Sequence, residues 1–330
     1  MNKLEHPETM NSTQVRDDWV PKDAYYSRDF AELERELLWP KIWHLVCREE
    51  ELPNVGSYYT YDILDDSIII MRTAPDTLKA FNNACLHRGR RLTEGCGRTA
   101  RLTCRFHGWK WNIDGTNHEV VDRGDWGGSL DDVDLDLPEF SIGTWGGFVF
   151  VNMDPDCESL ESYLKPIPHF LDVMEIDKQR LRWHITVDVE ANWKTCQEAF
   201  AEAYHVATTH PQFEPLIDSR SVTVGHGRHA QLRFLPPEEQ IIGYHRPQQG
   251  AHGDGRELAL QFMRMQVHDI QAIFSDRDLQ AASRVMELPE GTPYEVAMFK
   301  AFEYIQEAAI ACGAGHPEMT MEQFSDAGFD

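Results

Sequence analysis

Two short segments of the chain each place a cysteine shortly before a histidine. Cys85 and His87 form a Cys-x-His segment, and after sixteen intervening residues Cys104 and His107 form a Cys-x-x-His segment. Thiolate sulfur and imidazole nitrogen are ligands that iron and zinc favour. A glycine follows each histidine within two residues and lets the backbone pass close to a metal. The pattern therefore predicts a metal centre held between two loops.

The mixture of ligands indicates the kind of metal centre. In a [2Fe–2S] cluster with thiolates on one iron and imidazoles on the other, the neutral imidazoles leave less negative charge on the reduced state. The reduction potential is therefore higher than that of an all-cysteine cluster. Such a cluster suits a one-electron relay to an oxygen-activating site. Two alternatives exist for the same residues: a structural zinc site, and four side chains that share no function.

A second group of ligand-type side chains lies in the second half of the chain. On a helix, Glu198, Glu202 and His205 stand at i, i+4 and i+7 and share one face. His210 would point about 140° away from His205 on a continuous helix. A helix break is expected between them, because Pro211 disfavours helical backbone in the residue before it. Two histidines and a carboxylate would make the facial triad of O2-activating iron enzymes, and the alternative is a pair of ordinary polar histidines.

The cysteine and histidine segments, with their His-Arg-Gly and His-Gly-Trp elements, resemble the Rieske non-heme iron oxygenases, large (alpha) subunit. The resemblance extends from about residue 27 to the end of the chain. It implies that Cys85 and Cys104 bind one iron of a Rieske [2Fe–2S] cluster. It implies that His87 and His107 bind the other iron, and that Trp109 packs beside the cluster.

The resemblance continues in the second group. The family has an Asn-Trp-Lys opening, present here as residues 192–194, and an acidic residue followed after two residues by His-x4-His. It implies that His205 and His210 bind a mononuclear Fe(II). Glu202 stands where the family usually has an aspartate that links an iron-bound histidine to a cluster histidine of a neighbouring subunit. A glutamate there is one methylene longer, and we expect it to serve as the electron-transfer bridge.

The third ligand of the mononuclear iron is not identified in the sequence. Family members supply an aspartate from a helix near the chain end. Asp326 and Asp330 are carboxylates near the end of this chain, but nothing around them resembles that helix. We expect the ligand to lie beyond residue 330 in a longer protein. A naturally short relative with an incomplete site is the second possibility.

The chain is expected to consist of three segments that differ in secondary structure. Residues 1–42 form a polar leader and a helix that begins after Ser27 and ends near Pro40. Residues 43–158 form an all-β Rieske [2Fe–2S] domain. Residues 159–330 form an incomplete α+β catalytic domain for the mononuclear iron, which the resemblance makes a helix-grip sheet covered by helices.

Hydrophobic patterns and turn residues place the individual elements. Strands are expected at residues 67–71, 78–82, 148–151, 182–190, 221–224 and 231–234. Turns are expected at residues 54–56, 114–115 and 146–147, and a loop at 246–256. Helices are expected from Asn192 to about His205, over residues 263–285, and over residues 293–312 with an end at Gly313.

Residues 225–230 read Gly-His-Gly-Arg-His-Ala and match a dinucleotide-binding pattern. A strand rather than a helix is expected directly after them, so a hairpin turn is the better interpretation. With no dinucleotide motif, a separate ferredoxin or flavin reductase must supply electrons from NAD(P)H. Phe200, Phe213 and Phe262 are weak candidates for a substrate pocket, and core packing explains each of them more simply.

The composition of the 330 residues bears on the partners and the cellular compartment of the protein. A net charge of −24 argues against nucleic acid or an anionic membrane as a partner. No apolar stretch reaches the roughly 18 residues that span a bilayer. The polar N-terminus is not a secretory signal, so the seven cysteines are expected as thiols or metal ligands. We expect a cytoplasmic protein.

The resemblance implies an enzyme that hydroxylates an organic, typically aromatic, substrate with O2. It also implies a homotrimer, in some members with a small beta subunit. Two other classes fit parts of the sequence. One is a Rieske electron carrier without a mononuclear iron, and the other is a helix-grip protein that binds a small ligand without reacting with O2.

Overall fold

The computed structural model describes residues 22–202, 205–210, 221–234, 253–271 and 274–314. Contacts within the chain divide it into two units. The first comprises Pro21–Pro168 and Glu175–Asp188, and the second includes His169–Met174 and the described residues from Val189 onward. None of the described helices is long and apolar enough to cross a membrane.

The first unit begins with two helices, α1 (Asp23–Tyr26) and α2 (Arg28–Leu37). The Ser27 hydroxyl accepts a hydrogen bond from the backbone N–H of Phe30 at 3.4 Å, which caps α2. A 3-10 turn with Pro40 at its centre, Trp39–Lys41, follows α2. The expected helix between Ser27 and Pro40 is therefore confirmed.

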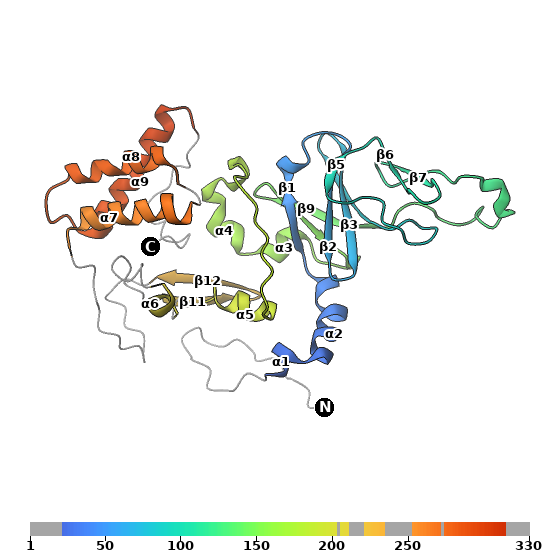
Figure 1. The fold of residues 1–330 in the computed structure, drawn as a ribbon, viewed down its shortest axis with the longest axis horizontal. Coiled ribbons are helices and arrows are strands. Elements are labelled where there is room, and N and C mark those ends of the chain that lie inside the picture. Colours follow the sequence, from blue (N-terminus) through green and yellow to red (C-terminus); the bar gives the residue numbers. More distant parts are fainter. Residues whose placement is uncertain (1–21, 203–204, 211–220, 235–252, 272–273, 315–330) are drawn as a thin grey trace. The chain divides into compact units, whose positions relative to one another are not determined.

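A seven-stranded sheet forms most of the first unit (Figure 1), and its neighbouring strands are antiparallel in the order β1-β10-β9-β4-β3-β2-β5. Its strands are β1 (His44–Arg48), β2 (Ser57–Ile63), β3 (Asp66–Ala74), β4 (Thr77–Asn82), β5 (Cys96–Arg98), β9 (Glu139–Trp145) and β10 (Phe148–Asn152). The strands expected at residues 67–71, 78–82 and 148–151 are confirmed as parts of β3, β4 and β10. Gly146 and Gly147 form the β9–β10 turn with φ of +60° and +75°.

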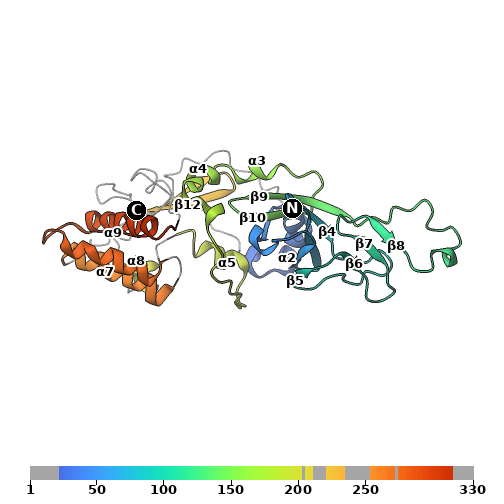
Figure 2. The same ribbon diagram turned by 90° about the horizontal axis from the view of Figure 1, so that it is seen from above.

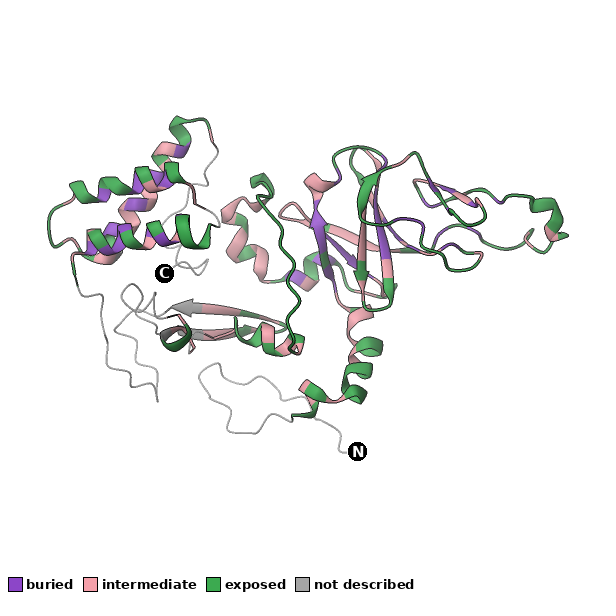
Figure 3. Ribbon diagram, viewed as in Figure 1, coloured by how far each residue is buried: buried purple, intermediate pink, exposed green. Residues whose placement is uncertain are grey.

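A smaller three-stranded sheet accompanies the large one. It consists of β6 (Arg101–Thr103), β7 (Lys110–Asn112) and β8 (Asn117–Glu119). A buried cluster joins side chains of both sheets, and Cys85 and Cys104 lie in it beside Ile69, Phe81 and Trp111. Figure 3 shows buried residues on strands of both sheets. The all-β character expected for this region is confirmed.

The stretch at residues 182–190, expected as a strand, contains no strand, so that prediction is wrong. The chain passes α3 (Leu160–Leu164), α4 (Ile167–Leu171) and short 3-10 turns before it. Its alternating apolar side chains are largely exposed, with Ile185 at 68% and Val187 at 72%. A strand needs a partner for its backbone groups, and no described strand pairs with this segment.

In the second unit, α5 (Trp193–Glu198) begins as expected, because the Asn192 carboxamide oxygen accepts from the Lys194 N–H at 3.0 Å. The expected continuation to His205 is wrong. The N–H of Phe200 bonds to the Gln197 carbonyl, so the backbone tightens after α5. Phe200 is 84% exposed, and no burial stabilises another turn.

A four-residue helix, α6 (Val206–Thr209), ends at His210, whose φ of −123° and ψ of 60° leave the helical region. The helix therefore ends directly before Pro211. The break expected between His205 and His210 is wrong, because α6 occupies the positions between them and the chain leaves the helical region only at His210 itself. Strands β11 (Ser221–His226) and β12 (His229–Phe234) then form an antiparallel hairpin. Gly227 turns that hairpin with a φ of +67°, which confirms the interpretation of residues 225–230 as a hairpin.

The last described elements are α7 (Gly255–Met265), a π-helical turn (Gln266–Ile270), α8 (Asp276–Ala282), a 3-10 turn (Ser283–Glu287) and α9 (Tyr294–Ala311). The three α-helices lie side by side in both ribbon views (Figures 1 and 2). They pack around a buried cluster that includes Met263, Val285 and Ile305. The expected helix at residues 293–312 and its end at Gly313, with φ of +76°, are confirmed.

The single helix expected at residues 263–285 is wrong. Gln271 takes a left-handed φ of +55°, and Ser275 starts α8 by exchanging hydrogen bonds with Asp278. Helix α7 also begins earlier than expected, because Asp254 caps the Arg256 N–H. Residues 246–252 of the expected loop, most of the leader, Phe213, Asp326 and Asp330 lie outside the described residues.

Candidate metal centres

The first cysteine–histidine loop, residues 85–91, is a tight turn folded on its own backbone. The N–H of Cys85 donates to the carbonyl of Arg90 at 2.9 Å, and the N–H of Gly89 donates to the carbonyl of Cys85 at 2.8 Å. Gly89 has a φ of +71°, a conformation that side chains with a Cβ rarely adopt. This backbone conformation explains why a glycine occupies that position of the motif.

The second loop, residues 104–109, repeats this pattern. The N–H of Cys104 donates to the carbonyl of Trp109 at 2.9 Å, and the N–H of Gly108 donates to the carbonyl of Cys104 at 3.0 Å. Gly108 has a φ of +75°. Two segments with different spacings, Cys-x-His and Cys-x-x-His, thus fold into loops with the same main-chain hydrogen bonds.

The two loops bring the cysteines together. Cys85 and Cys104 are 3% and 2% exposed, and their thiols share a hydrogen bond. Burial raises the pKa of the Cys85 thiol. Burial also opposes the Cys104 thiolate, but backbone N–H groups of Phe106 and His107 outweigh it and lower the pKa of that thiol. The lowered pKa of Cys104 favours its thiolate, the form that binds metals.

The two histidines also face each other. Their ring centroids are 4.6 Å apart. The His87 ring stacks on Trp109 at 5.3 Å and 11°, and Trp126 meets it edge-on at 5.5 Å and 83°. The Nδ1 atom of His87 is buried and has no hydrogen-bond partner among the residues that the structure describes. A buried nitrogen without a partner is costly unless it binds something, so this atom is suited to a metal.

The four candidate ligands can be compared with the ligands that a structural zinc ion and a [2Fe–2S] cluster take. Among the residues that the structure describes, no three or more His, Cys, Asp or Glu side chains are placed to hold one metal ion. A structural zinc ion takes four protein ligands around one centre. A [2Fe–2S] cluster takes two per iron, because its own sulfides complete each site. One pair of thiols and one pair of imidazoles is the donor set that such a cluster takes.

Trp126 is a site residue that the sequence analysis missed. It lies in the 3-10 turn Arg123–Trp126, and its ring contacts both His87 and Trp109. No motif surrounds it in the sequence. Its position follows from how the segment after β8 folds back, which a local pattern does not reveal.

The second candidate centre is built around α6. The Glu202 carboxylate accepts a hydrogen bond from His205 Nδ1 at 2.6 Å and another from the His205 backbone N–H at 3.1 Å. The rings of His205 and His210 lie 5.3 Å apart at 68°. Glu198 does not share a helix face with Glu202 and His205 as expected, because α5 ends at Glu198.

The proposed pocket aromatics do not gather at this centre as far as the structure describes them. Phe200 is exposed, and Phe262 packs against the buried cores of the α7–α9 helices. The core-packing interpretation therefore suits Phe262. Phe200 is exposed, so neither core packing nor the lining of a pocket describes it.

The sequence matches two family models in chain order. Residues 42–124 match the Rieske [2Fe-2S] domain, and residues 177–302 match the ring hydroxylating alpha subunit (catalytic domain). The chain therefore belongs to the Rieske oxygenases, as a relative of their large (alpha) subunits. These two domains imply a Rieske cluster and a mononuclear iron as cofactors.

Individual proteins that are similar to this chain are also oxygenase subunits. The carnitine monooxygenase oxygenase subunit of Escherichia coli (strain K12) is 31% identical over 235 residues, 68% of this chain and 61% of that protein. The anthranilate 1,2-dioxygenase large subunit of Acinetobacter baylyi is 32% identical over 61% of this chain and 44% of that protein. A crystal structure of a quaternary ammonium Rieske monooxygenase with L-carnitine has a TM-score of 0.59 and 27% identity, covering 64% of this chain and 61% of that one. The chain thus spans about three fifths or less of these relatives.

Proposed function

We propose that this chain is the oxygenase component of a Rieske-type system, which hydroxylates a small organic substrate with O2. The observation that carries the proposal is the pair of matching loops. They bring two thiols and two imidazoles together, and in the described part of the chain His87 Nδ1 is buried without a hydrogen-bond partner. Cys85 and Cys104 would hold one iron of the cluster, and His87 and His107 the other.

The proposed mononuclear site rests on the local geometry around α6. Because Glu202 binds Nδ1 of His205, the Nε2 atom of that ring is left for a metal ion, as in other carboxylate–histidine–metal arrangements. His210 supplies the second imidazole, and the third ligand is a carboxylate outside this group. When bound, the cluster supplies single electrons and the Fe(II) supplies O2 activation. In this proposal Glu202 orients His205 and lies on the path between the two centres.

The proposed partners follow from the class of protein. A separate ferredoxin or flavin reductase would deliver electrons, and a homotrimer would place each cluster beside the mononuclear site of a neighbouring subunit. The substrate class has two candidates, because the relatives named above act on carnitine and on anthranilate. An aromatic substrate, the expectation from the sequence, is therefore one of two classes to assay.

The first test is elemental analysis of protein prepared without oxygen, with EPR of the reduced sample. Two sulfides with about three irons per chain would support both centres, and two sulfides with about two irons would support the cluster alone. Zinc without sulfide would contradict the proposal. O2 uptake with a reductase and either quaternary ammonium or aromatic acid substrates would then identify the substrate class.

The second test separates the oxygenase from the electron carrier and the ligand-binding protein. His205→Ala should lose the mononuclear iron and keep the Rieske EPR signal. His268→Ala is the matched control, because His268 is an exposed histidine of the same unit. If His205→Ala holds as much iron as the unmodified protein, the mononuclear site is not where we place it.

A further inference from the structure

The two cluster loops are closed at their base in different ways. The second loop lies between β6 and β7, which pair through Leu102 with Trp111 and Thr103 with Lys110. Main-chain hydrogen bonds therefore close it. The first loop follows β4, and after Arg91 the described chain forms no strand until β5 begins at Cys96. No strand ladder closes this loop.

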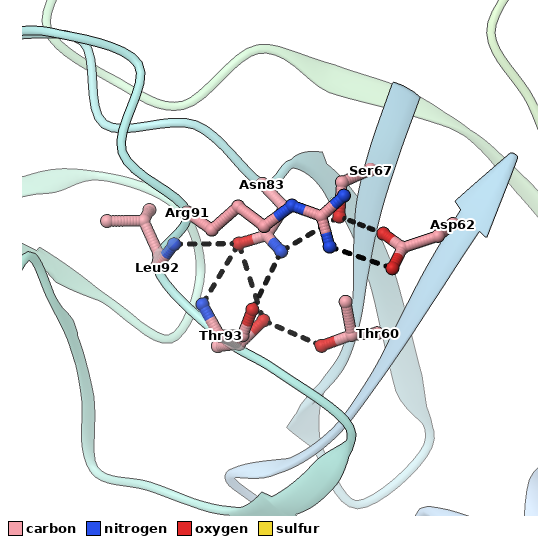
Figure 4. A network of polar contacts seen from close by, with 7 residues as sticks. All are labelled: Thr60, Asp62, Ser67, Asn83, Arg91, Leu92 and Thr93. Carbon is pink, nitrogen blue, oxygen red and sulfur yellow. Dashed lines mark hydrogen bonds and ion pairs between the residues drawn. The ribbon is translucent and has the colours of Figure 1, made fainter. Parts of the chain in front are cut away.

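The side chain of Asn83 occupies the place of the missing ladder. Its Oδ1 accepts hydrogen bonds from the backbone N–H groups of Leu92 and Thr93, at 2.9 and 3.0 Å. Its Nδ2 donates to the Thr93 carbonyl and to the Ser67 hydroxyl, both at 2.9 Å. Figure 4 shows the carboxamide at the centre of this network. Asn83 is 1% exposed, so these bonds are shielded from bulk solvent.

The partners of Asn83 are themselves fixed. The Thr93 hydroxyl bonds to the Thr60 hydroxyl at 2.9 Å. The Ser67 hydroxyl donates to one carboxylate oxygen of Asp62 at 2.5 Å, and Arg91 donates to the other at 2.8 Å. The network thus ties the end of the first loop to β2 and β3 (Figure 4).

We propose that Asn83 is a positioning residue for the Rieske cluster. Its carboxamide acts as a substitute peptide group that closes the first loop and thereby fixes Cys85 and His87. This inference rests on the proposed function, because it takes those two residues as cluster ligands. Each iron receives one of its ligands from this loop, so a looser loop would affect both irons.

The cost of losing the carboxamide follows from burial. An alanine at position 83 would leave two buried N–H groups and one buried carbonyl of residues 92 and 93 without their partner. Buried polar groups without partners are strongly unfavourable, so the segment would shift to find others. The second loop would keep its strand ladder. The ligands of the two loops would then no longer be held with the same precision.

The test compares Asn83→Ala with Asn112→Ala in the full chain. Asn112 ends β7, the strand that follows the second loop, and its carboxamide donates to the Thr116 hydroxyl at 3.0 Å. We would measure the EPR spectrum and midpoint potential of the reduced cluster, and the rate of cluster loss to a chelator. Asn83→Ala should change the spectrum and the potential, and should lose the cluster on the order of tenfold faster. Asn112→Ala should match the unmodified protein.

Thermal unfolding of the same samples separates positioning from general stabilisation. A lower Tm with an unchanged spectrum and potential would overturn the inference. If Asn83→Ala does not fold, Asn83→Asp decides, because it keeps the acceptor for residues 92 and 93 but loses both donors. An intermediate rate of cluster loss with an altered spectrum would support the inference, and wild-type values would overturn it. An unmodified protein without a Rieske signal would instead overturn the proposed function, and this inference with it.

Discussion

The two candidate metal centres differ in how their ligands are brought together. The cluster centre takes its side chains from two loops of one β unit, and both loops have the same main-chain hydrogen bonds. The mononuclear centre takes His205 and His210 from the two ends of one four-residue helix. The first is held by sheets and a shared buried core, and the second by a single turn and the Glu202 carboxylate.

This difference predicts different responses to mutation. A centre built from two loops on a packed core depends on residues distant in sequence, and it should fail when that core or either loop fails. A centre that depends on one short turn should respond mainly to its immediate partners.

Cys104→Ala should abolish the cluster, because it would leave one iron with a single protein ligand. Sulfide analysis and the EPR signal of the reduced protein would measure this. Cys96→Ala is the matched control, since Cys96 is exposed in β5 between the two loops, and it should keep the full signal. A normal signal from Cys104→Ala would remove this residue from the cluster.

Trp111→Ala should cost about 3–5 kcal/mol of unfolding free energy in the first unit. Its side chain is fully buried, and its Nε1 donates to the Leu135 carbonyl at 2.7 Å. Trp126→Ala removes a partly buried ring and should cost on the order of 1 kcal/mol. Denaturant unfolding would measure both. Equal costs would contradict the view that the core beneath the second loop holds the cluster centre.

Glu202→Gln should weaken iron binding at the mononuclear centre about 10- to 100-fold, because the hydrogen bond to His205 would lose its charge. Iron titration of protein depleted of the mononuclear metal would measure the affinity. The cluster signal should not change, because this substitution alters none of the proposed cluster ligands. Glu198→Gln, an exposed glutamate at the end of α5, serves as the control and should bind iron normally.

Arg91→Gln should cost no more than about 1 kcal/mol of unfolding free energy, because its ion pair with Asp62 is nearly half exposed on both sides. Burial opposes the Asp62 carboxylate, but hydrogen bonds from Ser67 and Arg91 outweigh it and lower its pKa. A lowered pKa stabilises the fold above the unfolded value of about 4, and this contribution is lost as the pH falls through the folded pKa. The difference between the two proteins should therefore shrink in acid. A cluster lost in Arg91→Gln would show that the exposed edge of the network, not Asn83, positions the loop.

Local sequence determined the parts of the molecule that depend on near neighbours. The two loops, the Ser27 and Asn192 caps, the Gly227 hairpin turn and the end of α6 before Pro211 all follow from a few adjacent residues. Steric limits on glycine and proline, and short side-chain caps, act within three or four positions. Such features can be read directly from the chain.

Other features required partners that the local pattern does not contain. The alternation at residues 182–190 is typical of a strand, but no described strand pairs with it. The helix expected at 263–285 breaks at Gln271 and Ser275, where the chain turns so that α7 and α8 can pack on α9. Intrinsic propensity is weak compared with pairing and packing, so these predictions failed where tertiary contacts decided the outcome.

The sequence by itself determined the chemistry of the protein: which residue types could hold a cluster, and which histidines could hold an iron. Only the tertiary structure decided how that chemistry is held. It placed Trp126 against His87, and it left His87 Nδ1 buried with no hydrogen-bond partner in the described ranges. It also put the Asn83 carboxamide where no strand ladder closes the first loop. The physical reason is that ligand identity is a property of single residues. The satisfaction of buried polar groups depends instead on segments that meet only in the folded chain.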